Sequence, residues 1–361
     1  MDEIVAWSEA EGITTPFLAI DLDGARRNVA AMQAFFDGKT ARLRPHVKTH
    51  KCSELALMQM RAGAAGVTCS TTDEVRAMAA AGIDDILLAN VVTDASRLRS
   101  LAEVGRTARV MAAVDSPQAV HRLSDAAIEA GTTLGALVEI DIGMRRNGVP
   151  DVATGLALAT VIADSAGLEL RGVMGYEGHI VGCVDRAERR TLATDCYERA
   201  LELLAALRDA GFDAPVLTGS STSTYDVTGV LTAMTDVQAG TYVLMDATYR
   251  ELTPEFAPAA VAVASVLTSR RDGPLVLDIG VKRLGSDWGK PSLIGRSASH
   301  AYTAEEHCVF TQTGPGPAVG QRVAILPPHI CTTMNLYRSV AAFSGGRFDR
   351  MLELDGRDPK A

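Results

Sequence analysis

The segment "LRPHVKTHK", Leu43 to Lys51, places two histidines and two lysines close together in a chain whose net charge is −9. It resembles the end of a strand, where side-chain alternation would put His46, Lys48 and His50 on one face. Restricted hydration lowers the pKa of a lysine, and a neutral amine can form a Schiff base with an aldehyde. The position at the strand end favours Lys48 over Lys51. A solvated basic strand end is the alternative interpretation.

A second segment, "LTGSSTSTYD", is rich in hydroxyl and small side chains and follows a later apolar run. Backbone N–H groups and hydroxyls in such a turn can bind a phosphate, and many barrels hold one at this place. Loops of serine, threonine and glycine are common, so the pattern alone is a weak signal. Together with a reactive lysine it suggests pyridoxal 5'-phosphate, because this cofactor needs both an amine and a phosphate site.

A third segment, "PPHICTTMN", carries His329 and Cys331 two residues apart at the end of an expected strand. Both side chains would then point the same way. An imidazole and a thiolate can hold a divalent metal, with Zn2+ favoured by the sulfur and Mn2+ or Mg2+ possible. Two ligands are too few for a closed structural site, so water or substrate would complete the set. The alternative is a buried pair packed without metal.

From about residue 41 to residue 250 the sequence repeats one pattern, which predicts the strands and helices that must position these residues. Eight short apolar runs each lead into a segment with helical spacing, which predicts an α/β fold with a (β/α)8 TIM-type barrel; an open doubly wound sheet is the alternative. Chemistry in such barrels lies at the C-terminal ends of the strands. The polar residues there are Lys48, Ser70, Asn90, Asp115, Asp141, Arg146, Tyr176, Glu177, His179, Gly219 to Thr224, and Gln238.

After Tyr249 the sequence changes to strand-like runs separated by glycine and proline, which predicts an all-β C-terminal domain. We expect residues 15–250 to form the cofactor-binding barrel. Residues 251–361, with the N-terminal segment 1–22, would form the β domain that carries the metal pair. "TPEFAP" is the expected linker, because proline interrupts both patterns.

Composition excludes several classes of protein. The acidic chain has no basic tract, so nucleic acid is not an expected partner. No apolar run approaches the roughly 18 residues of a membrane span, and "MDEIVAWSEA" does not resemble a secretory signal. Six scattered cysteines fit reduced thiols. We expect a cytoplasmic enzyme that acts on a small molecule.

Five motifs occur in the order found in the D-threonine aldolase and D-serine dehydratase family, which the chain resembles from about Thr15 to the final strand. They are "RPHVKTHK", "EIDIGMRRNGV", "GSSTSTYD", "VQAGTYVLMD" and "PPHICTTMN". The resemblance implies an alanine-racemase-like pyridoxal phosphate barrel of fold type III followed by a β domain. It also implies a homodimer, because the β domain of one chain usually completes the site of its partner.

The resemblance assigns roles to individual residues. Lys48 matches the Schiff-base lysine, Arg146 the arginine near the cofactor ring, and Tyr176 the aromatic residue after the sixth strand. The other matching positions are the phosphate loop at Gly219, Ser220, Ser221 and Thr222, the "QxGxY" residues Gln238 and Tyr242, and the metal pair His329 and Cys331.

Two departures from the family pattern affect the interpretation. The phosphate loop is "GSSTS" instead of a glycine-rich segment, so hydroxyl contacts would replace direct backbone approach. Aldolases of the family typically carry His-x-Asp at the metal, whereas eukaryotic-type D-serine dehydratases carry His-x-Cys. Cys331 therefore favours dehydration, although "GYEGH" around Tyr176 matches neither subgroup closely.

The resemblance implies a metal-assisted lyase acting on a D-3-hydroxy amino acid. The leading hypothesis is dehydration to a 2-oxo acid and ammonia, with Lys48 removing the Cα proton. Retro-aldol cleavage to glycine and an aldehyde is the alternative, with His179 as the catalytic base. A racemase using Tyr302 or Tyr337, and a non-catalytic cofactor carrier, are further alternatives. Recurring family segments contain Lys282, Asp287, Glu306 and His307, for which the sequence gives no role.

Overall fold

A computed structural model describes residues 2–357, so residue 1 and residues 358–361 of the predicted β domain lie outside the described part. The chain forms two compact units. The barrel unit comprises Gln33–Lys48 and Leu55–Gly240; the sheet unit comprises the chain up to Met32, Thr49–Glu54 and Thr241–Arg357.

The barrel unit contains an eight-stranded parallel sheet in the order β2-β9-β8-β7-β6-β5-β4-β3. A parallel bridge between His46 and Thr68 joins the segment after β2 to β3 and closes the ring. The predicted (β/α)8 barrel is therefore confirmed. The strands are β2 (Arg42–Leu43), β3 (Val67–Cys69), β4 (Asp85–Leu88), β5 (Arg109–Val114), β6 (Leu134–Glu139), β7 (Leu168–Met174), β8 (Val216–Gly219) and β9 (Asp236–Val237).

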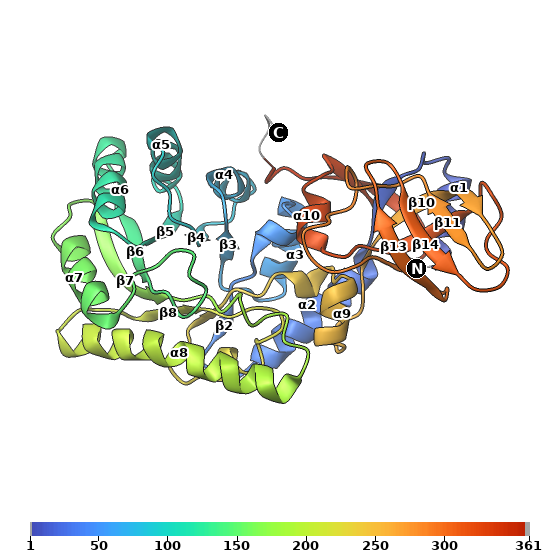
Figure 1. The fold of residues 1–361 in the computed structure, drawn as a ribbon. Helices are drawn as coiled ribbons and strands as arrows, with labels where there is room; N and C mark the ends of the chain where they lie inside the picture. Colours follow the sequence, from blue (N-terminus) through green and yellow to red (C-terminus); the bar gives the residue numbers. More distant parts are fainter. Residues whose placement is uncertain (1, 358–361) are drawn as a thin grey trace. The chain divides into compact units, whose positions relative to one another are not determined.

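Helices connect these strands and lie on the outside of the sheet (Figure 1). They are α3 (Ser53–Arg61), which begins in the sheet unit, and α4 (Thr72–Ala80), α5 (Ala95–Val104), α6 (Pro117–Ala130), α7 (Val152–Ala163) and α8 (Arg186–Asp209). The last five each begin after a residue whose side chain accepts a backbone N–H of the first turn, which stabilises the helix start. These caps are Thr71, Asp94, Ser116, Asp151 and Asp185.

One face of the parallel sheet is filled by apolar side chains from five neighbouring strands: Leu87, Ala113, Leu137, Met174 and Val216. Side chains two residues apart on a strand share a face. The same face therefore carries Glu139 at the end of β6 and Tyr176 directly beyond β7. The packed interior thus orients the polar groups at the strand ends.

Two predicted strands are much shorter than expected. β2 ends at Leu43, and Lys48 lies in the 3-10 helix η1 (Val47–Thr49), so the prediction that His46, Lys48 and His50 share a strand face was wrong. Pro45 has no N–H to donate to a neighbouring strand, and after the bridge at His46 the chain turns into η1. In "DVQAGTYVLMD" the strand β9 likewise stops at Val237, and η3 (Thr241–Val243) follows; a further 3-10 helix, η2, spans Thr228–Val230.

The sheet unit is built on a nine-stranded sheet with the path β13-β14-β11-β10-β1-β16-β17, to which β15 adds through β10 and β12 through β15. β1 pairs antiparallel with β10 and parallel with β16. The strands are β1 (Phe17–Asp21), β10 (Ala260–Ser269), β11 (Pro274–Leu277), β12 (Ser292–Leu293), β13 (Ala298–Thr303), β14 (Cys308–Gln312), β15 (Arg322–Leu326), β16 (Ser339–Ser344) and β17 (Arg347–Glu353).

This unit is mostly β rather than all-β as predicted, because short helices interrupt it. They are α1 (Asp2–Ala10), α9 (Ala247–Leu252), α10 (Ile330–Met334) and α2 (Leu22–Phe36), which continues into the barrel unit. Its core is formed by Ile4, Phe17, Ala19, Val261, Val263, Ala324, Ala341 and Phe343. Within the described chain, no helix combines the length and apolarity needed to cross a bilayer.

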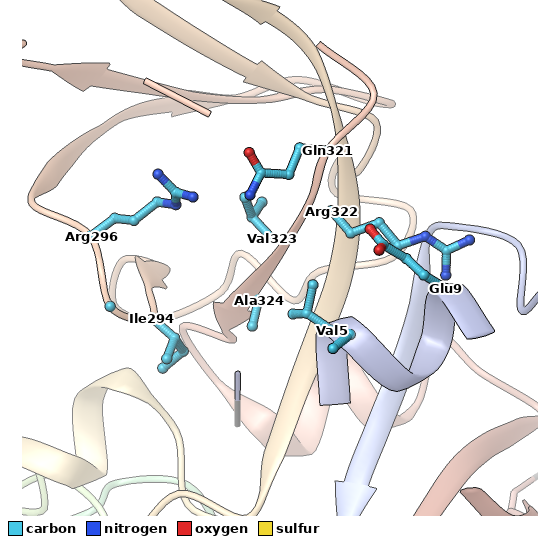
Figure 2. A pocket seen from close by; sticks show the side chains of 10 residues that line it. Val5, Glu9, Ile294, Arg296, Gln321, Arg322, Val323 and Ala324 are labelled. Carbon is cyan, nitrogen blue, oxygen red and sulfur yellow. The ribbon is translucent and has the colours of Figure 1, made fainter. Parts of the chain in front are cut away.

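An open cavity of about 520 Å³ lies in the sheet unit between α1, β15 and the turn after β12. Figure 2 shows Arg296 and Gln321 on one side of it and Glu9 with Arg322 on another. Arg322 is held in place because its Nη1 donates to the carbonyl oxygen of Ser8 at 2.7 Å. None of the predicted site residues lines this cavity.

A buried ion-pair group holds the barrel strands together at the ends where β4 and β9 begin. Arg44 is only 3% exposed, and its guanidinium lies 2.5 Å from Asp85 Oδ1 and 3.1 Å from Asp236 Oδ1. A buried arginine is tolerated when its charge is paired and its donors are used. The group therefore fixes the chain after β2 against two other strands.

We expect Arg44→Ala to lower the free energy of unfolding by about 3–5 kcal/mol, because it leaves the buried carboxylate of Asp236 without its ionic partner. Arg109→Ala is the matched control: Arg109 also pairs with Asp85, at 3.1 Å, but its side chain is 78% exposed. Its loss should cost less than about 1 kcal/mol. Urea unfolding followed by circular dichroism measures both values, and equal effects of the two variants would contradict the assignment.

Candidate active site

Three predicted residues meet around one aromatic ring in the barrel unit. Lys48 Nζ lies 5.4 Å from the ring centroid of Tyr176, and Arg146 Cζ lies 5.6 Å from it. Lys48 is half-buried in η1, and Tyr176 follows β7. An amine and a guanidinium beside the same aromatic side chain fit a ring-shaped aldehyde cofactor, since the amine can bind the aldehyde.

Glu139, which sequence analysis did not single out, supports Arg146. Its Oε1 lies 3.7 Å from Arg146 Nη2, while its buried Oε2 has no hydrogen-bond partner among the described residues. Burial raises the pKa of Glu139 to about 7, although the charge of Arg146 opposes this shift. The one available signal was a charged residue at the end of the otherwise apolar run "LGALVE".

The predicted phosphate loop is a compact, buried cluster of hydroxyls after β8. The Ser221 hydroxyl lies 2.9 Å from the hydroxyl of Thr224 and 3.2 Å from that of Ser223. Ser220 has a positive φ of 70°, a strained conformation for a serine. Thr222 is buried in the same loop. The donor set suits a phosphate, with hydroxyls in place of the usual glycines.

Gly219 and Gln238 support this loop. A Cβ atom on Gly219 would collide with the carbonyl oxygen of Gly175 and the hydroxyl of Tyr197, so only glycine fits. Gln238 donates its backbone N–H to the carbonyl oxygen of Gly219 at 2.7 Å and its side-chain amide to Thr218 Oγ1 at 3.0 Å. The structure therefore brings the predicted residues from Gly219 to Thr222 and Gln238 together.

His179 and Tyr242 have surroundings that differ from this cluster. His179 is exposed, and its Nε2 lies 3.5 Å from Cys196 Sγ. Burial raises the pKa of the Cys196 thiol to about 11, so His179 faces a neutral thiol at pH 7. Tyr242 belongs to the sheet unit, where it is fully buried against Phe256. The roles predicted for both residues stay predictions.

His329 and Cys331 meet in the sheet unit, but not on a strand face as predicted. β15 ends at Leu326, Pro327 and Pro328 prevent further pairing, and His329 is the residue from which α10 begins. Burial lowers the pKa of His329, but its hydrogen bonds to Cys331 and Asp287 outweigh burial and raise that pKa to about 9.

Two aspartates position this pair. Asp287 Oδ2 lies 2.7 Å from His329 Nδ1, which leaves Nε2 as the atom that could bind a metal. Asp246 accepts the backbone N–H of Ile330 at 2.9 Å and that of Tyr249 at 2.8 Å. Sequence analysis had flagged Asp287 without a role, and the structure pairs it with His329.

The donor types at this pair suit a metal ion, because one imidazole nitrogen remains and the Cys331 sulfur is half-buried. Cys331 Sγ also lies 3.4 Å from Thr49 Oγ1. Within the described residues, no group of three or more His, Cys, Asp or Glu side chains is placed to hold an ion. The pair would therefore need water or substrate to complete a ligand set.

The tyrosines considered for racemisation differ in exposure. Tyr302 is exposed on β13. Tyr337 is buried, its hydroxyl has no hydrogen-bond partner, and the guanidinium of Arg283 lies 5.4 Å from its ring centroid. Lys282, from the recurring segment of unknown role, forms an ion pair with Glu306 at 2.8 Å.

Comparison with known proteins supports the resemblance along the whole chain. Residues 20–248 match the family described as alanine racemase, N-terminal domain, and residues 259–343 match the putative serine dehydratase domain. The chain is 31% identical to a D-threonine aldolase from Arthrobacter sp., over 96% of this chain and 93% of that protein.

Solved structures agree with this comparison. The D-threonine aldolase from Filomicrobium marinum superposes with a TM-score of 0.92 at 32% identity, covering 95% of this chain and 96% of that one. The D-threo-3-hydroxyaspartate dehydratase from Delftia sp. HT23 gives 0.85 at 30% identity, over 94% and 97%. Alanine variants of a histidine and of a cysteine two residues apart are known for a D-threo-3-hydroxyaspartate dehydratase, the cysteine variant in a metal-free form.

We expect Glu139 to make stability depend on pH. The folded state keeps a proton that the unfolded chain loses above its ordinary pKa of 4.5, so the free energy of unfolding falls as pH rises from 4.5 to about 7. The contribution is up to about 3 kcal/mol. Urea unfolding of the full chain at several pH values should show a smaller fall in Glu139→Gln.

The control for this measurement is Glu169→Gln, because Glu169 is exposed and paired with Arg171 at the surface. It should keep the pH dependence of the unaltered chain. If all three proteins lose stability equally between these pH values, Glu139 does not retain the proton.

Proposed function

This chain belongs to the D-threonine aldolase and D-serine dehydratase family of pyridoxal phosphate-dependent lyases, and we propose that it converts a D-3-hydroxy amino acid to a 2-oxo acid and ammonia. The observation that favours dehydration is the pair of His329 and Cys331. It has the same residue types and spacing as the two residues altered in variants of a D-threo-3-hydroxyaspartate dehydratase. Aldolases of the family typically have aspartate in place of the cysteine.

The residues of the barrel unit would bind the cofactor and move one proton. Pyridoxal phosphate supplies an electron sink for the bonds at Cα. Lys48 would hold the cofactor through its Nζ amine, and the same amine would be the base that accepts the Cα proton of the substrate. Arg146 would lie near the pyridine nitrogen, where a permanent cation disfavours ring protonation. Glu139 restrains Arg146 from behind.

The residues of the sheet unit would assist the leaving group. A divalent metal on His329 and Cys331, with Zn2+ favoured and Mn2+ or Mg2+ possible, would supply Lewis acidity toward the β-hydroxyl. Asp287 fixes the ring of His329 so that Nε2 remains available. Cys331 contributes a negative ligand, which favours a soft metal over Mg2+.

Retro-aldol cleavage to glycine and an aldehyde is the second candidate, because the likeness to D-threonine aldolases extends over the whole chain. This reaction needs a base for the β-hydroxyl proton, and His179 is the residue proposed for it. Its Nε2 lies 3.5 Å from the neutral thiol of Cys196, so this ring nitrogen contacts a thiol and not a carboxylate. We also propose a homodimer, to be tested by light scattering.

Product analysis on D-threonine tests the proposal, because D-threonine can undergo either reaction. With purified protein, pyridoxal phosphate and zinc or manganese, we expect 2-oxobutyrate and ammonia, measured by chromatography and an ammonia assay. Glycine and acetaldehyde would instead establish retro-aldol cleavage. Recovery of L-allo-threonine alone would favour racemisation, because inversion at Cα leaves Cβ unchanged.

Lysine variants control this assay. Lys48→Ala should lose the absorbance of the lysine-bound cofactor and lower kcat/KM at least about 100-fold. Lys51→Ala is the matched control, since it lies three residues away and should keep both. Loss of activity in Lys51→Ala with retention in Lys48→Ala would transfer the role to Lys51.

Asp287→Asn should weaken metal binding by about 10–100-fold, the usual effect of losing a group that orients a ligand histidine. Titration with zinc against a coloured chelator measures the Kd, and circular dichroism monitors folding. Glu306→Gln is the control, because Glu306 is an exposed acid of the same unit that pairs with Lys282. Equal zinc affinity in Asp287→Asn and the unaltered protein would contradict this role.

A further inference from the structure

Glu177 is a fully buried acid in contact with the phosphate loop, and the reaction proposed above does not use it. Its Oε1 accepts a hydrogen bond from Thr224 Oγ1 at 2.5 Å and lies 3.3 Å from Thr228 Oγ1. Its Oε2 lies 3.0 Å from the hydroxyl oxygen of Tyr197, which comes from α8. The acid therefore connects the end of β7, the phosphate loop and α8.

The hydroxyl of Tyr197 has three polar neighbours but only one proton. The backbone N–H of Ser220 donates to its oxygen at 2.6 Å. The carbonyl oxygen of Gly175 and Glu177 Oε2 both lie 3.0 Å from that oxygen. Because the carbonyl can only accept, it takes the tyrosine proton, and the remaining contact then needs a proton on Glu177.

If Glu177 were ionised, the hydrogen bonds around the Tyr197 hydroxyl would be less well satisfied. If Tyr197 donated to a carboxylate, its oxygen would face the carbonyl oxygen of Gly175 at 3.0 Å with no proton between them. Among the described residues, no lysine, arginine or histidine forms an ion pair with Glu177. A buried charge without a partner is costly. Burial also raises the pKa of Glu177.

The charged residue Arg189 of α8 contacts the same loop, through the carbonyl oxygen of Ser223 at 3.0 Å. Two titratable groups that interact with Glu177 itself carry no charge at pH 7. They are Tyr197 and Cys196, both from α8. Burial raises the pKa of Cys196 to about 11 and that of Tyr197 well above its usual value. Neither side chain can therefore stabilise an anion at Glu177 by charge, and the hydrogen-bond geometry alone determines which oxygen carries the proton.

We propose that Glu177 is a neutral carboxylic acid and a positioning residue that holds the Ser220–Thr224 loop ready for the cofactor phosphate. This inference rests on the proposed use of the loop as the phosphate site. Through Tyr197, the acid orients the backbone N–H of Ser220. Through Oε1 it orients Thr224, whose hydroxyl accepts the backbone N–H of Ser221 at 3.0 Å.

Neutrality matters because the ligand is an anion. A carboxylate in contact with the loop would repel a phosphate, and the low dielectric of the interior would strengthen that repulsion. A carboxylic acid makes the same contacts without the charge. The loop then offers hydroxyls and backbone dipoles to a phosphate without a negative neighbour at Glu177.

Cofactor binding tests this role without using activity. Pyridoxal phosphate and pyridoxal, which lacks the phosphate, are titrated into the full-length protein, and the absorbance of the lysine-bound form gives each Kd. Glu177→Gln should keep the Kd for pyridoxal phosphate within about 3-fold, because its amide donates to Tyr197 and accepts from Thr224 as the acid does. Glu198→Gln, an exposed residue of α8, is the control.

Removing the contacts should weaken phosphate binding only. Glu177→Ala should raise the Kd for pyridoxal phosphate at least about 10-fold, as expected when buried donors lose their acceptor, and leave that for pyridoxal nearly unchanged. Tyr197→Phe should act in the same direction and serves if Glu177→Ala does not fold. An equal loss for both ligands would overturn the positioning role. Loss in Glu177→Gln equal to that in Glu177→Ala would overturn the neutral acid.

An infrared difference spectrum between the unaltered protein and Glu177→Gln reports the proton directly. The proposal predicts the carbonyl band of a protonated carboxyl, whereas carboxylate bands would overturn it. If the unaltered protein binds pyridoxal as tightly as pyridoxal phosphate, the phosphate-site premise fails and the positioning role fails with it. The infrared band then still decides the protonation state of Glu177, so the two failures are distinguishable.

Discussion

Closure of the parallel ring is the constraint on which the site depends. The carbonyl oxygen of Pro45 accepts the backbone N–H of Thr68 at 2.8 Å, and the N–H of His46 donates to Ala239 at 3.1 Å on the other side. These two hydrogen bonds hold Pro45 and His46 to the strands on both sides, at the point where the chain stops being a strand. Lys48 follows two residues later, so the reactive amine is carried by a turn whose start is fixed.

The buried ionisable groups of the barrel unit are paired at one end of its strands and incompletely paired at the other. Where β4 and β9 begin, the charge of Arg44 is paired with two carboxylates. At the opposite ends of the strands, one oxygen of Glu139 has no partner among the described residues, and the side-chain contacts of Glu177 are with the hydroxyls of Tyr197, Thr224 and Thr228. Strongly perturbed, incompletely paired groups are typical of functional sites. The end with paired charges stabilises the barrel, and the end with incompletely paired groups is available to ligands.

The rhythm of apolar runs and helical segments was enough to predict the barrel, because eight buried strands and capped helices each leave a local pattern. Local patterns failed where the chain departs from regular pairing: Pro45 shortens the expected strand before Lys48, and Pro327 turns the chain into α10. The role of Glu139 could not be predicted, since its contact with Arg146 depends on the path of the intervening loop. The pairing of Asp287 with His329 joins residues 42 positions apart and leaves no local signal.

The place of β1 in its sheet has a consequence for how the protein is made. Ala19 pairs with Val261 on one side and with Ala341 on the other, so a strand near the start of the chain needs partners from the last third. On the ribosome, all eight barrel strands are synthesised before either partner exists. Until these partners are synthesised, the backbone N–H and C=O groups of β1 are unpaired and can pair with the wrong strand. A message truncated before β16 would leave that edge open permanently, and its product would be a substrate for aggregation or proteolysis.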